Sequence, residues 1–116
     1  AARKAWRETD LKHRLARHHG ANTVAMFDAW SSMWSADWFR DWNIEAALPD
    51  IACPVLAIQG EDDEYGAMAQ LDAIARGVSG PVKTLQVPNC GHAPHVQARA
   101  GVEAAMVGFI KSLWAA

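Results

Sequence analysis

The spacing of apolar residues changes near Pro49, and the change separates two kinds of segment. After Pro49 two short strands alternate with two helices, at residues 55–59, 67–76, 82–87 and 94–114. The first strand is almost wholly apolar, which is typical of a strand covered on both faces. The 22-residue connection 60–81 between the strands predicts a parallel, right-handed βαβ unit, followed by the final amphipathic helix. The fold class is therefore α/β.

Before Pro49 the pattern is helical and rich in aromatic residues. One helix is expected over residues 3–19, ended by Gly20, because glycine commonly follows a helix C-terminus. A second helix is expected after a capping Asn22, and a third, shorter one after a capping Ser35. A last helical turn is expected to stop at Pro49.

Four tryptophans spaced by four residues lie in this helical half, namely Trp30, Trp34, Trp38 and Trp42. An aromatic stripe at helical spacing is more often core than ligand site, so core packing is the first interpretation. The second is that Trp30, Trp34 and Trp38 line a pocket, where their aromatic surface suits an apolar or aromatic substrate.

The two strands make an incomplete sheet. A first strand that is apolar on both faces needs a neighbour on each side, and this chain supplies one. We therefore expect the sheet to continue in polypeptide outside this chain, or in another copy of it. The free flank of the strand is expected to make the isolated chain self-associate.

Composition and charge limit which partners and which cellular location can be expected for this chain. A chain of 116 residues that is 51% hydrophobic can form one packed core. Its net charge of −2 gives no reason to expect a nucleic-acid or membrane partner. Residues 1–19 hold six Lys/Arg against two acids, which we interpret as a solvated basic helix face. Two cysteines, Cys53 and Cys90, make no disulfide framework, so reduced thiols and a cytoplasmic location are expected.

Groups capable of acid–base chemistry follow each of the two strands. The acidic turn that contains Asp62, Asp63 and Glu64 follows the first strand, and His92 follows the second. Parallel strands lie ~4.8 Å apart and end at the same edge of a sheet, within hydrogen-bonding reach of each other's turns. A carboxylate beside a histidine fixes the imidazole tautomer and stabilises its charged form. These turns predict an aspartate–histidine pair.

From about Pro49 onward the chain resembles the C-terminal part of the α/β-hydrolase superfamily. The likeness is carried by the strand and Gly-x-x-Asp turn at residues 60–63, the Gly-His turn at residues 91–92, and the final helix. Residues 1–48 resemble the helical cap that such enzymes insert before their last two strands. The resemblance implies two parts: a cap segment, 1–48, and a partial α/β-hydrolase core, 49–116.

The resemblance puts the triad acid at Asp63, with Asp62 as the alternative, and the general base at His92. It implies an enzyme that hydrolyses a small-molecule ester, lactone or similar carbonyl substrate, with neither cofactor nor metal. The nucleophile is missing, because no Gly-x-Ser-x-Gly turn occurs in the chain. The serines that lack this glycine-flanked turn are Ser31, Ser32, Ser35, Ser79 and Ser112. We therefore expect a C-terminal hydrolase fragment that is inactive by itself.

Other interpretations of these residues are weaker. Cys90, His92 and His95 could form a metal site, but the spacing lacks a second pair of ligands. A nucleophilic Cys90 beside His92 is conceivable, yet two residues apart on a turn they would tend to point in different directions. The alternative at the level of the whole chain is a non-catalytic interaction module derived from a hydrolase.

Overall fold

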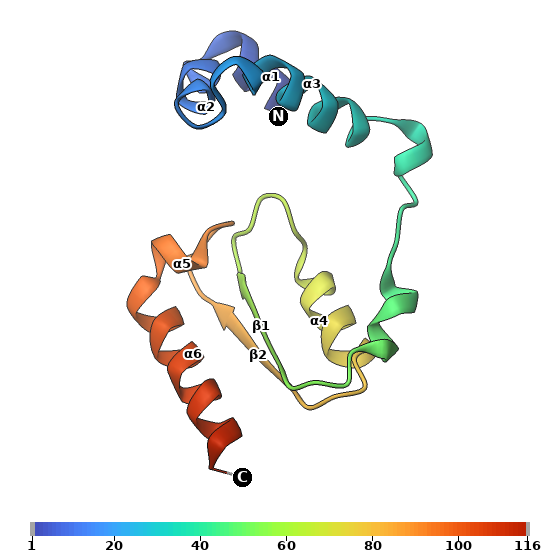
Figure 1. Cartoon of the computed structure of the whole chain (residues 1–116), viewed down its shortest axis with the longest axis vertical. Helices are drawn as coiled ribbons and strands as arrows, with labels where there is room; N and C mark the ends of the chain where they lie inside the picture. Colours follow the sequence, from blue (N-terminus) through green and yellow to red (C-terminus); the bar gives the residue numbers. More distant parts are fainter. Residues whose placement is uncertain (1, 116) are drawn as a thin grey trace. The chain divides into compact units, whose positions relative to one another are not determined.

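The structure is a computed structural model that describes residues 2–115 (Figure 1). It is a mixed α/β protein whose elements, in chain order, are α1 (Ala2–Glu8), α2 (Leu11–His19), η1 (Gly20–Asn22), α3 (Thr23–Met33), η2 (Asp37–Phe39), η3 (Glu45–Asp50), β1 (Val55–Gly60), α4 (Met68–Gly77), β2 (Val82–Val87), α5 (Pro94–Gln97) and α6 (Arg99–Trp114). The chain divides into two compact units between Asn43 and Ile44. Within residues 2–115, no helix combines the length and apolarity that a membrane span requires.

The second unit is built on two parallel strands. β1 pairs with β2 in a register that runs from Val55 opposite Val82 to Gly60 opposite Val87, and α4 connects the strands. In Figure 1, α4 and α6 lie on opposite sides of the strand pair. The parallel βαβ arrangement predicted from the sequence is therefore confirmed.

The core of this unit lies between the sheet and α6. Its buried residues are Val87, Cys90 and Val102, and partly buried Ile58, Leu85 and Ala98 pack against them. Ile58 and Leu85 are opposite each other in the register, so their side chains share one face of the sheet. On α4, Leu71 is buried and 2% exposed. Both helices thus stabilise the strands through apolar contacts, which fixes where the strand ends lie.

The long final helix predicted over residues 94–114 is interrupted. α5 ends at Gln97, and Ala98 leaves the helical region with φ −128° and ψ 38° before α6 begins. Ala98 packs against the buried core residues, and Val102, one turn further on, is part of that core. The interruption therefore lets the chain turn so that α6 covers the sheet, which helical periodicity alone does not reveal.

β1 is less covered than its sequence predicts. Among residues 2–115 it has one neighbouring strand, β2. The residues of β1 before Gly60 are half-buried instead of buried, because one flank lacks a partner. A helix lies on each side of the strand pair, as the sequence predicts, and the second neighbouring strand that it also calls for is missing from residues 2–115.

The helix predicted over residues 3–19 is two helices. The Thr9 hydroxyl donates to the Ala5 carbonyl at 2.7 Å and accepts from the Leu11 amide at 3.2 Å. Such side-chain bonds compete with helical ones and end α1 at Glu8. Gly20, at φ 52°, follows the last residue of α2 as predicted, because this backbone conformation favours glycine.

The predicted helix caps are wrong. Asn22 makes no side-chain cap bond, and the Thr23 hydroxyl donates to the Gly20 carbonyl instead. The Ser35 hydroxyl donates back to the Ser31 carbonyl at 2.7 Å, in the turn that follows α3, instead of capping the next helix. Pro49 lies inside η3 and does not stop it.

The tryptophan stripe is exposed. Trp30, Trp34, Trp38 and Trp42 are 40%, 58%, 75% and 55% exposed. The last three surround Phe39, whose ring centroid lies 5.0, 5.5 and 5.1 Å from theirs. The first interpretation, core packing, is therefore wrong. Trp34 and Trp38 meet the Phe39 ring edge-on and Trp42 stacks on it, so these three form an exposed aromatic cluster around η2.

Candidate active site

Two turns at the carboxyl ends of the strands carry the predicted pair. Beyond the strands, the Glu61 amide donates to the Val87 carbonyl at 3.0 Å and the Asp62 amide to the Cys90 carbonyl at 2.9 Å. These bonds continue the pairing of β1 and β2 into the turns. The main chain therefore brings Asp63 and His92 together.

Asp63 and His92 form a direct contact. Nδ1 of His92 lies 3.0 Å from Oδ1 and 3.1 Å from Oδ2 of Asp63. The Asp63 side chain is 8% exposed, whereas that of His92 is 62% exposed. A carboxylate that faces Nδ1 selects the tautomer with the proton on Nδ1. Nε2 is then left as the proton acceptor on an accessible imidazole.

The Asp63 carboxylate is held by its own turn. Oδ1 accepts from the amides of Tyr65 at 2.9 Å and Gly66 at 3.2 Å. The Gln59 side-chain amide donates to Oδ2 at 3.4 Å and to the Gly66 carbonyl at 2.7 Å. The Tyr65 amide lowers the pKa of Asp63, burial opposes this, and the bond from His92 lowers the pKa further. On balance the pKa lies below its ordinary value, so the carboxylate is charged at neutral pH.

This lowered pKa predicts an acid-labile contribution to stability. A carboxyl whose folded-state pKa is depressed stabilises the fold above its unfolded pKa, about pH 4, and this contribution is lost as pH falls through the folded value. The free energy of unfolding of the chain should therefore exceed that of Asp63→Asn at pH 6. The difference should shrink as pH falls below about 4. Asp62→Asn is the control, and a difference independent of pH would contradict the assignment.

Asp62, the alternative acid, does not contact His92 in this way. Asp62 is exposed, and it is its main-chain amide that bonds to the histidine turn, through the Cys90 carbonyl. Asp63 is thus the carboxylate that the structure places against the imidazole.

Three residues near the pair were missed by the sequence analysis. The Tyr65 ring meets the His92 ring edge-on, with centroids 4.9 Å apart and planes at 69°. The Gln59 side chain donates a hydrogen bond to the Gly66 carbonyl of the acidic turn, and the Gln97 side chain accepts one from the Gly91 amide of the histidine turn. Tyr65 could have been suspected from its position two residues after Asp63. The glutamines carry no sequence signal, since their roles depend on which way their side chains point.

The other candidate groups do not form a site. Cys90 is 2% exposed and part of the core, which shields its thiol from substrate. His95 is exposed on α5. Among residues 2–115, no group of three or more His, Cys, Asp or Glu is arranged to hold a metal ion.

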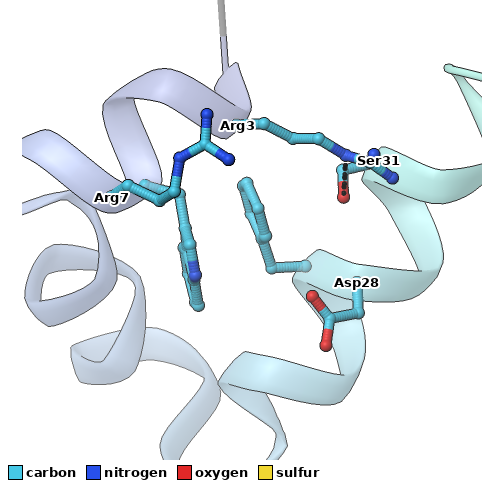
Figure 2. A pocket seen from close by; sticks show the side chains of 6 residues that line it. Arg3, Arg7, Asp28 and Ser31 are labelled. Atoms are coloured by element: carbon cyan, nitrogen blue, oxygen red, sulfur yellow. Dashed lines mark hydrogen bonds between the residues drawn. The ribbon is translucent and has the colours of Figure 1, made fainter.

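Two cavities lie elsewhere in the molecule. One of about 430 Å³ is lined by Ile110, Lys111, Trp114 and Ala115 on α6. The other, of about 160 Å³, lies in the first unit, where Figure 2 shows Arg3 and Arg7 of α1 facing Asp28 and Ser31 of α3. Its wall is completed by Trp6 stacked on Phe27, with ring centroids 4.0 Å apart. Neither cavity is lined by Asp63, by His92 or by the tryptophans proposed to bind substrate.

Comparison of the chain with protein-family models, with curated proteins and with solved structures gave no match. No family is assigned on that basis. In the site itself, a carboxylate that is held in place orients an accessible imidazole. Such an imidazole can accept a proton and return it.

Proposed function

We propose that Asp63 and His92 are the acid and base of a serine-type hydrolase with an α/β-hydrolase fold. The nucleophile and the oxyanion-hole donors would come from polypeptide outside these 116 residues. The observation that carries this proposal is the contact of His92 Nδ1 with both oxygens of Asp63, at 3.0 and 3.1 Å. The resemblance of the two turns to those of the superfamily supports it.

The asymmetry of the pair favours a catalytic role over a surface ion pair. Exposed ion pairs contribute little to stability and need no fixed geometry. Here the carboxylate is almost buried and receives two main-chain amides, while the imidazole stands exposed beside it. Such an arrangement orients the histidine without enclosing the nitrogen that handles the proton.

In the proposed reaction, a serine Oγ attacks the substrate carbonyl carbon while its proton moves to His92 Nε2. The Asp63 carboxylate accepts a hydrogen bond from the Nδ1–H group of His92 and stabilises the positively charged imidazolium. The tetrahedral intermediate then collapses, and the Nε2 proton passes to the leaving group. Water repeats the sequence on the acyl-serine, with His92 again as the base, and releases the acid. No cofactor or metal takes part in these steps.

The substrate class is a small molecule with an ester, lactone or similar carbonyl group. The exposed side chains of Trp30, Trp34 and Trp38 are the candidates that would supply apolar surface for such a molecule. We place the protein in the cytoplasm, a proposal supported by the free thiols of Cys53 and Cys90.

The proposed function is tested with a fluorophosphonate probe, which labels activated serines, and with a chromogenic ester. The 116-residue chain should show neither labelling nor turnover, since it lacks the elbow serine and the oxyanion donors. The protein translated from the complete reading frame should show both. Labelling of the 116-residue chain itself, or an unreactive product of the complete frame, would contradict the proposal.

A non-catalytic interaction module is the second candidate, and the surface of the second unit favours it. β1 has one neighbour among the described residues, and α6 exposes Met106, Val107, Ile110, Leu113 and Trp114. Either the rest of a hydrolase or another copy of the chain could cover these groups. The encoding gene separates the two: a reading frame that extends upstream into a Gly-x-Ser-x-Gly turn supports the hydrolase, and a start codon just before Ala1 supports the module.

A further inference from the structure

The turn that carries His92 is held by one side chain from the following helix. Gln97, the last residue of α5, points its carbonyl oxygen Oε1 back at this turn. Oε1 accepts from the Gly91 amide at 2.6 Å and from the Cys90 thiol at 3.3 Å. A single acceptor thus bridges the two residues that precede His92.

The geometry of the turn makes this bridge consequential. The turn begins at Asn89, which has φ 52°, a conformation that a non-glycine residue adopts at some cost. Cys90 is buried in the core beside Val87 and Val102. Gly91 and His92 then leave the core, and His92 is exposed. Gln97 therefore fixes the turn at the point where it leaves the packed part of the molecule.

Gly91 also lies between two side chains. A Cβ on Gly91 would be 3.1 Å from Oε2 of Glu64 and 3.4 Å from Oε1 of Gln97. Its main chain is thus in close contact with the acidic turn on one side and α5 on the other. Because Gly91 directly precedes His92, this close contact also limits where the His92 main chain can lie.

We propose that Gln97 is a positioning residue, which holds His92 against Asp63 by anchoring the Gly91 amide. The inference rests on the proposed function only for its effect on turnover. The contact itself involves this chain's own residues, so it can be tested without the nucleophile. A neutral acceptor suits the site, because a carboxylate at position 97 would face Glu64 across Gly91.

The first experiment is NMR of the 116-residue chain, with ¹⁵N-labelled histidine, at neutral pH. We expect Gln97→Leu to raise the exchange rate of the His92 Nδ1 proton with water by about tenfold, since the anchoring hydrogen bond is lost. The proportion of the Nδ1–H tautomer should fall with it. Gln97→Glu keeps an acceptor oxygen but puts a second carboxylate near Glu64, so it should restore both signals only in part. Gln86→Leu makes the same chemical change at an exposed position on β2 and should leave them unchanged.

Gln97→Asn is a second variant, to be measured in case Gln97→Leu does not fold. It keeps the amide but is one methylene shorter, so it should remain folded while losing the His92 signal. An unchanged Nδ1 proton in folded Gln97→Leu or Gln97→Asn would overturn the proposal.

The second experiment measures turnover by the protein from the complete reading frame. Gln97→Leu should lower kcat about 10- to 100-fold and leave KM near its original value, since small misplacements of a catalytic group are costly. If the complete protein is inactive while Gln97→Leu still alters the His92 signal, the proposed hydrolase function fails and the positioning role stands. If kcat is unchanged in an active enzyme, the positioning role fails alone.

Discussion

His92→Ala is expected to abolish ester hydrolysis by the protein from the complete reading frame, lowering kcat by about 10⁴- to 10⁶-fold. The loss is large because no other group in the described site can take the serine proton. The imidazole is the accessible member of the pair, whereas the Asp63 side chain is almost buried and its Oδ1 accepts hydrogen bonds from the Tyr65 and Gly66 amides. KM should change little, since the imidazole acts in the transition state.

Two further variants make this result specific. Asp63→Asn should lower kcat about 10⁴-fold, because an amide in place of the carboxylate favours the wrong imidazole tautomer. His95→Ala, an exposed histidine on α5, is the matched control and should keep turnover near that of the unaltered protein. Full activity in folded His92→Ala would contradict the assignment of the base. Equal losses in His92→Ala and His95→Ala would show that the helix matters and the pair does not.

Gly60→Ala is expected to destabilise the 116-residue chain by about 3 kcal/mol and to separate the two turns. A Cβ on this residue would overlap the carbonyl oxygens of Cys90 and Gly91. These are main-chain atoms next to His92, so no flexible side chain can move aside. Denaturant unfolding measures the stability, and NMR of the His92 Nδ1 proton reports the loss of its contact with Asp63.

The matched control for this substitution is Gly108→Ala. Gly108 lies within α6, and an added Cβ would meet nothing within 4 Å. Alanine in a helix interior should stabilise the chain by about 0.5–1 kcal/mol relative to glycine. Destabilisation by both substitutions, or by neither, would show that the close approach of the turns at Gly60 is not what constrains the site.

The strands and the pair could be predicted because each depends on local pattern plus one geometric rule. Residues 55–59 and 82–87 have the composition of strands, and a connection long enough for a helix makes such strands parallel. Parallel pairing puts both turns at one edge, so a contact between an acid of the first turn and His92 follows from topology. The choice of Asp63 over Asp62 came from the resemblance of the turn to a Gly-x-x-Asp pattern.

What could not be predicted depends on competition between hydrogen bonds and on packing. Thr9 and Ser35 bond to carbonyls one turn back, and this choice is not encoded in apolar spacing. The exposure of the tryptophans depends on what covers them, which helical periodicity cannot tell. No sequence pattern marks Gln97 either, because an exposed glutamine on a short helix resembles any other solvated residue.

The hydrogen bonds that link the acidic turn to the histidine turn have a consequence for how such a site can change. Because the Glu61 and Asp62 amides make these bonds, their side chains are free to vary without disturbing the register of the two turns. The flanking positions can therefore diversify to suit different molecules while the acid and the base stay in place. An acid–histidine pair that is held by main-chain hydrogen bonds can keep its geometry while the side chains around it change.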